Sequence, residues 1–499
     1  MKKELKLVLL SVLLFSLAYP PLPLGFLAYF CLVPLILALE NKTPKQAFKL
    51  GYLFGLLSNL LLLYWIAWPI FSGYYILFLA ASVAILILSF FPAVLVTLYC
   101  LIQERWKGKA VFAFPFLWVV MEYSKSLGEI AFPWLNLAYT QSKYLSLIQY
   151  SSFAGAYGVT FWVVSVNLVL YFYVKSYLST RKLVGMTLLF SGFIILPLLY
   201  GHYAMKQEVM KDGPEIALLQ GNIDIQTKWN PDLTDYNFAT YFGMAKQSAK
   251  KKVGLIVWPE SAAPCYLAYE WRYLYLVERL TDSLGTPMLV GTQHYRQNGD
   301  YTFYNSAFLF KPSQRDFQIY DKIDMVPFSE RVPYMERLGF LNKLQLGQSE
   351  FSRGKNFTIF SLPESNFAVL ICFESAFPNL VRRFVNHGAS FIVNITNDAW
   401  FGKTSGPFQH SQMAVFRAIE NRISIARCAN TGISMFVDPY GRISQSTRIW
   451  TKDVITEKVA LQKKKTFYTK FGDWLPKLCL ILTLAVIVIS FVPKREQVK

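Results

Sequence analysis

The sequence has few charged residues for its length. Of its 499 residues, 16% are Asp, Glu, Lys or Arg, against about 25% in ordinary soluble domains. Hydrophobic residues make up 54%, and the mean hydropathy is +0.32. These values exclude a disordered chain and an ordinary soluble enzyme. They indicate a polytopic membrane protein that carries a soluble part.

Cysteine and histidine are also scarce. The six cysteines include no CxxC pair, and the four histidines are far apart. Because no spacing of metal-ligand type occurs, the sequence predicts no metal site. The net charge of +19 is not gathered into a basic cluster with interleaved aromatics, so we expect no nucleic-acid partner. We interpret the positive surplus as membrane topology and attraction to anionic lipid.

Residues 50–103 contain no Asp, Glu, Lys or Arg. Because one spanning helix needs about 20 residues, this stretch predicts two spans, separated near residues 68–73. The first span also resembles a signal peptide, but further spans follow at once and favour an uncleaved helix. The fifth is the weakest, since it is short and contains Pro115. In all, we expect about eight spans, near residues 6–19, 23–39, 51–71, 75–102, 109–124, 157–174, 184–204 and 474–492.

Lys and Arg gather in alternate loops and at both ends of the chain. Because loops rich in Lys and Arg stay in the cytoplasm, both termini are predicted to be cytoplasmic. We predict a membrane domain of seven helices over 1–204, a periplasmic domain over 205–472, and a C-terminal transmembrane helix with a cytoplasmic tail over 473–499. The basic groups at the termini and in the alternate loops are Lys2, Lys3 and Lys6; Lys42, Lys45 and Lys49; Arg105, Lys107 and Lys109; Lys175, Arg181 and Lys182; and Lys494, Arg495 and Lys499.

The periplasmic segment has the pattern of one α/β domain. Short β-rich runs alternate with helical stretches, which predicts a sandwich of sheets and helices. The expected strands are 216–219, 255–258, 287–291, 306–310, 367–371, 391–395, 424–428 and 433–437. The expected helices include 269–284, 379–386 and 410–421.

Two segments of this domain place charged residues next to apolar runs. Glu260 follows the expected strand 255–258 and a proline, which cannot continue a strand ladder. Lys322 and Glu330 lie together in the segment 320–330. Taken alone, Glu260 is interpreted as a solvated carboxylate in a turn, and the other two as surface charges.

A third segment ends in a cysteine. Cys372 stands where the expected strand 367–371 gives way to a helix, and a helix N-terminus favours the thiolate form. The N–H of the next residue, Phe373, is placed to donate to an oxyanion. Taken alone, Cys372 is equally interpreted as a buried structural cysteine.

Together and in this order, the three segments resemble the nitrilase superfamily, in which a Glu, a Lys and a Cys form the catalytic triad. Other segments match the same superfamily in the same order: 397–402 (NDAWFG), 417–421 (RAIEN), 429–434 (ANTGIS) and 438–441 (DPYG). The resemblance implies an αββα sandwich for this domain.

The membrane context narrows the resemblance further. The whole chain resembles the apolipoprotein N-acyltransferase family of bacteria, the membrane-embedded branch of the superfamily. Phe373 stands where many members have Tyr, so a Tyr hydroxyl cannot be essential here. The matching segments are 132–135 (FPWL), 220–223 (QGNI) with Trp229, 326–333 (VPFSERVP) and 406–410 (GPFQH).

This resemblance implies a reaction and its partners. A fatty acyl chain would move from a membrane phospholipid, through a thioester on the enzyme, to the α-amino group of the N-terminal S-diacylglyceryl cysteine of an apolipoprotein. This is the last step of lipoprotein maturation, at the bacterial inner membrane. Neither a metal nor a cofactor is implied, because the phospholipid ester is already activated.

The resemblance also assigns roles to residues. Cys372 is the nucleophile, Glu260 the proton acceptor, and Lys322 the electrostatic partner of the oxyanion. Glu330 and Glu374 keep Lys322 charged and shape the site. Trp229 closes the acyl or headgroup pocket, unless it is a core indole.

Some alternatives stay open at this point. His410 is either the base of a Cys-His pair or, as the Glu-Lys-Cys pattern favours, a packing or hydrogen-bonding residue. The whole chain is alternatively a membrane-tethered nitrilase-type amidase, or a transporter with an extracytoplasmic binding domain. Charged residues inside the spans would favour a transporter, and the span interiors contain almost none.

Overall fold

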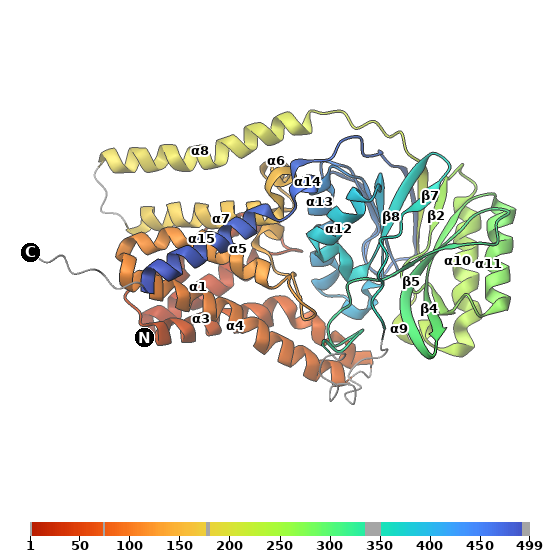
Figure 1. The fold of residues 1–499 in the computed structure, drawn as a ribbon, viewed down its shortest axis with the longest axis horizontal. Helices are drawn as coiled ribbons and strands as arrows, with labels where there is room; N and C mark the ends of the chain where they lie inside the picture. Colours follow the sequence, from red (N-terminus) through yellow and green to blue (C-terminus); the bar gives the residue numbers. More distant parts are fainter. Residues whose placement is uncertain (1, 73–74, 176–179, 335–350, 492–499) are drawn as a thin grey trace, which may run out of the picture.

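The computed structural model describes residues 2–72, 75–175, 180–334 and 351–491. A helical bundle forms one end of the molecule, and two β-sheets with their covering helices form the other (Figure 1). The basic residues 494, 495 and 499, on which part of the predicted orientation depends, lie outside the described residues.

Among the described residues, five helical stretches are long and apolar enough to cross a membrane. They are Pro44–Trp68, Ala81–Ser124, Ser151–Lys175, Val184–Met205 and Trp474–Phe491. The corresponding helices are α3 (Pro44–Leu63), α4 (Tyr75–Trp106), α5 (Phe114–Ser124), α7 (Ser151–Lys175), α8 (Thr180–Met205) and α15 (Trp474–Phe491). The count of eight spans therefore stays a prediction.

The other expected spans are shorter or interrupted. The first is the helix α1 (Lys2–Leu17), which has 16 residues. The second is divided between the 3-10 helix η1 (Gly25–Tyr29) and α2 (Val33–Ala38). The fifth begins as the 3-10 helix η3 (Lys107–Ala113) before α5 starts.

A side chain of α7 stabilises the interruption of the second expected span. Asn167 Oδ1 accepts from the backbone N–H of Leu32 at 2.8 Å, and its Nδ2 donates to the carbonyl of Ala28 at 2.7 Å. Backbone polar groups at membrane depth need partners inside the protein. Asn167 supplies them, which permits a broken helix where hydropathy alone predicts a continuous one.

The described residues of the other half form two sheets. In the first, the order is β13 (Asp453–Lys458), β1 (Glu215–Gln220), β2 (Leu255–Val257), β4 (Met288–Asn298), β5 (Asp300–Phe310) and β6 (Gln318–Asp321), with β3 (Ala263–Tyr266) paired to β4. In the second, it is β12 (Ile443–Ser446), β11 (Met435–Val437), β10 (Ile425–Ala429), β9 (Phe391–Thr396), β8 (Ser365–Ile371) and β7 (Phe360–Leu362). All eight expected strands are present, whereas β3, β6, β7, β12 and β13 were not expected.

The two sheets pack face to face because their strands alternate side chains between two apolar cores. In β1, Ile216 and Leu218 share a core with the second sheet, whereas Ala217 and Leu219 share one with the outer helices α10 (Thr234–Ser248) and α11 (Trp271–Leu284). The helices α12 (Pro378–Asn386) and α13 (Gly406–Asn421) cover the second sheet (Figure 1). The layers follow the order α-β-β-α, as predicted.

The helices α12 and α13 also form the seam with the membrane bundle (Figure 1). Glu420 of α13 accepts from the backbone N–H of Ala156 in α7 at 2.8 Å. Gln149 donates from Nε2 to the carbonyl of Tyr440 at 2.9 Å. One face of the αββα domain is therefore docked on the bundle by buried hydrogen bonds.

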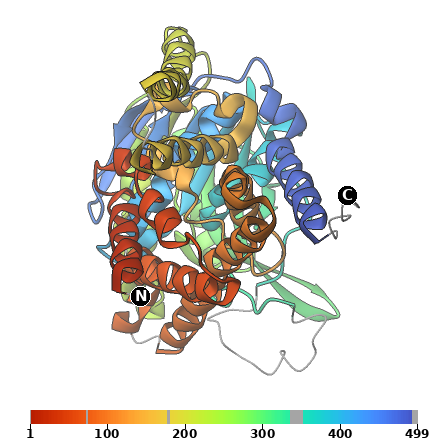
Figure 2. The same ribbon diagram turned by 90° about the vertical axis from the view of Figure 1, so that its left-hand side faces the viewer.

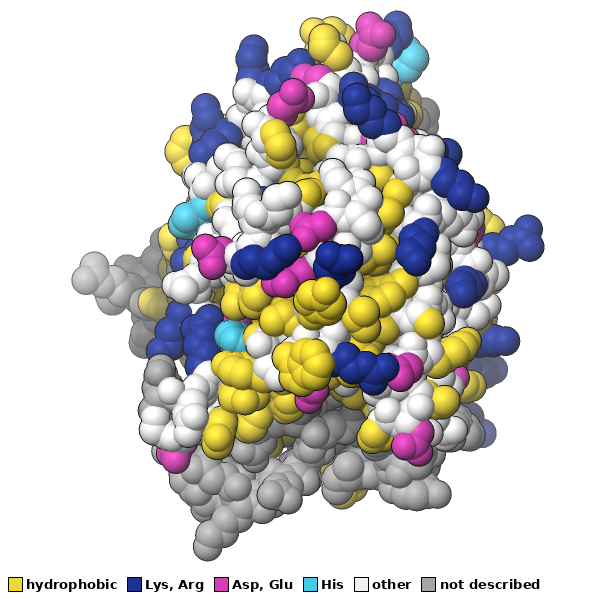
Figure 3. All heavy atoms as spheres, turned by 90° about the vertical axis from the view of Figure 1, so that its right-hand side faces the viewer, with side chains coloured by type: hydrophobic (Ala, Val, Ile, Leu, Met, Phe, Trp, Pro, Cys, Tyr) yellow, Lys and Arg dark blue, Asp and Glu magenta, His cyan; other side chains and the backbone are white. Residues whose placement is uncertain are grey.

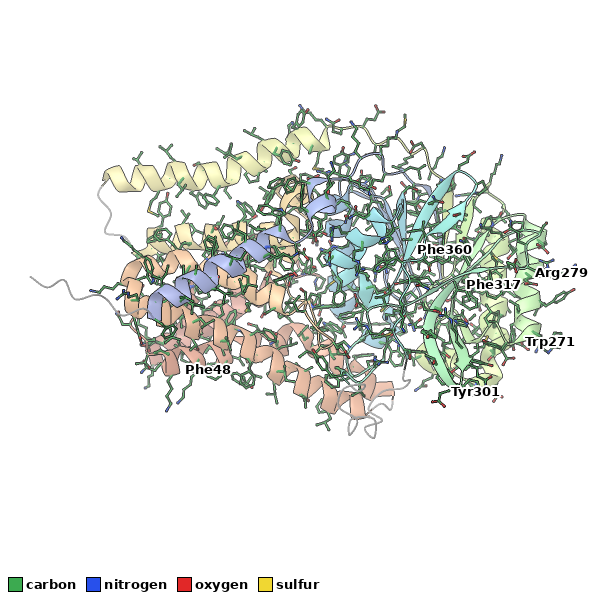
Figure 4. The ribbon with its side chains drawn as sticks, in the orientation of Figure 1. Phe48, Trp271, Arg279, Tyr301, Phe317 and Phe360 are labelled. Atoms are coloured by element: carbon green, nitrogen blue, oxygen red, sulfur yellow. The ribbon has the colours of Figure 1, made fainter. Side chains whose placement is uncertain are left out.

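The two ends of the molecule have different surfaces. Viewed from the bundle end, α8 and α15 lie at the margin (Figure 2), and Leu188 and Leu196 of α8 are each 69% exposed, as suits contact with lipid. At the opposite end, Lys, Arg, Asp and Glu side chains are spread over the surface (Figure 3). These charged side chains suit contact with water. Trp271 and Tyr301 lie at the same end (Figure 4).

The orientation is testable with cysteine labelling in intact cells. A Trp271→Cys variant should react with a membrane-impermeant maleimide once the outer membrane is permeabilised, because the side chain is 78% exposed at the end predicted to be periplasmic. Lys107→Cys, in a loop predicted to be cytoplasmic, should react only after cell lysis. Labelling of Lys107→Cys in intact cells would contradict the predicted topology.

Candidate active site

Cys372 lies at a sharp turn directly after β8. It is the first residue of the 3-10 helix η7 (Cys372–Ala376), and its φ of 54° is in the left-handed region. Such a conformation is uncommon for a non-glycine residue and persists only when the surroundings hold it. The side chain is buried, with 8% exposure.

Glu260 lies after the end of β2, beside the second sheet. Its Oε1 accepts from Asn305 Nδ2 of β5 at 2.8 Å, and its Oε2 accepts from the backbone N–H of Asn397 at 2.7 Å. Asn397 follows β9 directly. The carboxylate is therefore held by both sheets, by a residue inside β5 and by the residue that follows β9.

Lys322 follows β6 and is fully buried. Its Nζ lies 2.8 Å from Glu330 and 4.0 Å from Glu260 Oε1. Burial disfavours the charged amine, but the carboxylates of Glu330 and Glu260 outweigh it and raise the pKa of Lys322 above its ordinary value. Lys322 is therefore a permanent cation beside Glu260.

The surroundings of Cys372 keep its sulfur protonated at rest. Burial raises the pKa of the Cys372 thiol well above its usual range, the Glu260 carboxylate raises it further, and Lys322 opposes both. The helix that begins at Cys372, η7, is only one short 3-10 turn, and burial has the largest effect on the pKa of the thiol. A base is needed when the thiol reacts.

Glu374 holds the turn at Cys372 rather than the amine of Lys322. Its Oε2 accepts from the backbone N–H of Ile371 at 2.7 Å. Its Oε1 accepts from the Tyr320 hydroxyl at 2.6 Å and from the N–H of Ile323 at 2.7 Å. One carboxylate thus joins the turn at Cys372 to the segment around Lys322.

A cavity of about 250 Å³ opens in front of these residues. Glu260, Glu330 and Cys372 line one side of it. Most of the other lining residues come from the membrane domain, and these are apolar apart from Ser124 and Lys125. Among them are Trp65, Ala81, Ala84, Ile87, Leu88, Phe91, Ile130, Phe132 and Trp134.

Two further predicted residues take different places. Phe373 lines the cavity, and its ring lies parallel to those of Phe132 and Trp134, with centroids 5.8 and 6.1 Å away. Trp229 is half-buried at the end of the helix α9 (Ile225–Lys228) and is not among the cavity-lining residues. Its predicted part in closing the pocket stays a prediction.

Sequence reasoning missed Lys228. Its buried Nζ donates to the backbone carbonyl of Glu260 at 2.8 Å. Burial lowers the pKa of Lys228 to about 7, although Glu260 and Cys372 oppose this effect. The lysine directly precedes Trp229, but only the folded chain brings it to Glu260.

No cluster of three His, Cys, Asp or Glu side chains suited to a metal ion occurs among the described residues. The cavity is lined by a thiol and two carboxylates, with a buried ammonium directly behind the carboxylates and backbone N–H groups at a helix start. This set suits covalent acyl transfer through a cysteine.

The fold and the site define a nitrilase-type catalytic domain. Residues 215–467 match the family model for carbon-nitrogen hydrolases. Residues 11–169 match the model for the apolipoprotein N-acyltransferase N-terminal domain.

Relatives from bacteria match along nearly the whole chain. The apolipoprotein N-acyltransferase of Geobacter metallireducens is 35% identical over 98% of this chain and 96% of its own. That of Chlorobaculum tepidum is 31% identical over 99% and 98%. Apolipoprotein N-acyltransferase 1 of Treponema denticola is 29% identical over 99% and 98%. The chain belongs to the apolipoprotein N-acyltransferase family.

The opposite effects of Glu260 and Lys322 on the thiol are testable. Glu260→Gln removes a charge that raises the pKa of Cys372, so alkylation of Cys372 by iodoacetamide at pH 8 should become several-fold faster. Lys322→Gln removes a charge that lowers this pKa, so alkylation should become slower. Mass spectrometry of the Cys372 peptide measures both rates. Changes in the same direction would contradict this electrostatic account.

Gly291 of β4 is placed where Glu260 needs space. A Cβ at this position would lie 2.3 Å from the carbonyl oxygen of Pro259 and 2.8 Å from Cα of Glu260. Since this backbone cannot move without moving the carboxylate, Gly291→Ala should lower acyl transfer at least tenfold, by about 1–3 kcal/mol of strain. Gly243→Ala, in α10 with nothing within 4 Å of the new Cβ, should keep wild-type activity. Equal activities in the two variants would show that Glu260 tolerates displacement.

Proposed function

We propose that this chain moves a fatty acyl group from a membrane phospholipid to the α-amino group of the N-terminal S-diacylglyceryl cysteine of an apolipoprotein. The observation that carries the proposal is the cavity, which has the reactive groups on one side and apolar membrane-domain side chains on the other. An acyl chain requires an apolar wall. Attack on the ester carbonyl requires the thiol of Cys372 and the charged side chains around that thiol.

In the first half-reaction, Glu260 takes the proton of the Cys372 thiol as the sulfur attacks the ester carbonyl. The tetrahedral oxyanion is stabilised by Lys322 and by the backbone N–H of Phe373. When the C–O bond breaks, Glu260 returns the proton to the departing alkoxide. The products are an acyl thioester on Cys372 and a lysophospholipid.

In the second half-reaction, the neutral α-amine of the apolipoprotein attacks the thioester carbonyl. Lys322 and the N–H of Phe373 stabilise the second oxyanion. Glu260 takes one amine proton, the C–S bond breaks, and the sulfur of Cys372 recovers that proton. The amide is the product, and the order of events makes the mechanism ping-pong.

The buried neighbours support both steps. The ion pair of Lys322 with Glu330 keeps the ammonium charged without water. The hydrogen bonds of Glu374 keep the Cys372 turn and the Lys322 segment at a constant distance. Trp229 is proposed to close the pocket when substrate is bound. The chemistry draws only on the side chains and backbone of the chain.

The location follows from the substrates and the predicted topology. We place the chain in the bacterial inner membrane, with a membrane domain over 1–204, the catalytic domain over 205–472 on the periplasmic side, and a last span over 473–499. About eight spans would leave both termini in the cytoplasm. Both lipid substrates then reach the cavity from the leaflet in which they are anchored.

The thioester is the decisive intermediate. Cells or vesicles containing wild-type protein and a phospholipid with an isotope-labelled acyl chain should yield Cys372 carrying that acyl mass. Cys372→Ala should carry no adduct and lose transfer to a diacylated lipopeptide by several orders of magnitude. Cys265→Ala, which changes a half-buried cysteine of β3, should retain activity. Hydrolysis of small soluble amides, with no adduct formed from the labelled phospholipid, would instead support a membrane-tethered amidase.

A further inference from the structure

Gln409 and His410 are neighbours on α13 that face different partners. Gln409 is buried against the membrane domain. Its Oε1 accepts from the indole N–H groups of Trp65 and Trp134, at 3.1 and 2.9 Å, and its Nε2 donates to the carbonyl of Leu62 at 3.1 Å. Three membrane-domain groups thus hold one catalytic-domain side chain.

His410 is fully buried and faces the nucleophile turn. Its Nε2 lies 3.1 Å from the carbonyl oxygen of Cys372 and 3.1 Å from Ser375 Oγ. Its Nδ1 lies 2.9 Å from Asp398, which pairs with Arg427 at 2.9 Å. Asp398 therefore fixes the Nδ1 side of the imidazole, and the Nε2 side contacts the backbone carbonyl of Cys372.

The Cys372 carbonyl receives a hydrogen bond in either neutral form of the ring. With the proton on Nε2, His410 donates to it directly. With the proton on Nδ1, the hydroxyl of Ser375 donates to it at 3.1 Å while Nδ1 donates to Asp398. This carbonyl belongs to the residue whose left-handed backbone needs external support.

The membrane domain also touches this turn directly. The Trp134 ring lies 5.2 Å from the His410 ring and stacks on Phe373, the residue after Cys372, at an interplanar angle of 15°. The Trp134 N–H that bonds Gln409 belongs to the same ring. Buried contacts therefore run without interruption from the membrane domain through α13 to the turn at Cys372.

We infer that Gln409 and His410 form a link through which the membrane domain positions the Cys372 thiol. Both are positioning residues, and neither exchanges protons with substrate. The link makes the reactivity of the thiol depend on correct docking of the two domains, so that Cys372 is competent only where the apolar wall of the cavity is in place. The inference rests on the proposed role of Cys372 as the nucleophile.

The test compares Gln409→Leu with Gln149→Leu in the full-length protein in lipid nanodiscs. Gln149 is a matched control, since it also bonds across the seam, donating to the Tyr440 carbonyl and accepting from Arg422 at 2.6 Å, but has no contact with the Cys372 turn. The rate of iodoacetamide alkylation is read at the Cys372 peptide, beside the melting temperature and the rate of acyl-enzyme formation.

Gln409→Leu should lower the Cys372 alkylation rate about tenfold or more, since it removes the three hydrogen bonds that join this side chain to the membrane domain. Gln149→Leu should keep the wild-type alkylation rate, although both variants lower the melting temperature. Equal rates in wild type and Gln409→Leu would overturn the inference, as would an equal loss in Gln149→Leu. A wild-type protein that is alkylated but never acylated by phospholipid would overturn the proposed function alone.

Three other variants keep the test decisive if Gln409→Leu does not fold. Trp65→Phe keeps a ring and removes one indole N–H, and should slow alkylation several-fold. His410→Ala should slow it strongly, whereas His410→Gln, whose amide N–H can reach the Cys372 carbonyl, should restore part of the rate. Wild-type rates in Trp65→Phe and His410→Ala together would overturn the link.

Discussion

The buried charge of Lys322 is the constraint on which the site depends. An ammonium removed from water is costly unless carboxylates compensate for it, and here Glu330 at 2.8 Å and Glu260 at 4.0 Å do so. That requirement brings the end of β2, the end of β6 and the segment at Glu330 together. The same grouping places a base and a cation beside the sulfur of Cys372, so the interaction that stabilises the fold locally is also the one that suits the chemistry.

A high pKa for Cys372 fits a site that faces lipid. A resting thiolate would be exposed to alkylation and oxidation, whereas a buried, protonated thiol reacts slowly. In the proposed mechanism, Glu260 removes the thiol proton as the sulfur attacks the ester. Desolvation, which raises the pKa of the thiol, also strengthens the attraction of Lys322 for a developing oxyanion. In the proposed function, the apolar cavity lining from the membrane domain therefore binds the acyl chain and also strengthens these electrostatic interactions.

Much of this arrangement was predictable from local patterns. The absence of charge over residues 50–103, the basic alternate loops and the eight apolar runs of 205–472 indicate a membrane bundle and an α/β domain. The segments around Glu260, Lys322 and Cys372 stand out because polar residues follow apolar runs, but only their joint order, which resembles the nitrilase superfamily, indicated a site. In the second expected span, by contrast, hydropathy predicts a continuous helix. The helix is interrupted there, because the side chain of Asn167, 135 residues from Leu32, supplies hydrogen-bond partners to the backbone.

Local pattern therefore determined which segments are apolar and which are strands, and the resemblance to a family indicated which residues carry reactive groups. Only the tertiary structure decided which groups meet. Strand β13 pairs with β1 across more than 200 residues of chain, and Lys228 reaches the carbonyl of Glu260 from a short helix. Gln409 meets Trp65 and Trp134 only at the seam. The physical reason is that hydropathy and turn preferences act over a few neighbouring residues, whereas hydrogen bonds and pKa values depend on whatever the fold brings within a few ångströms.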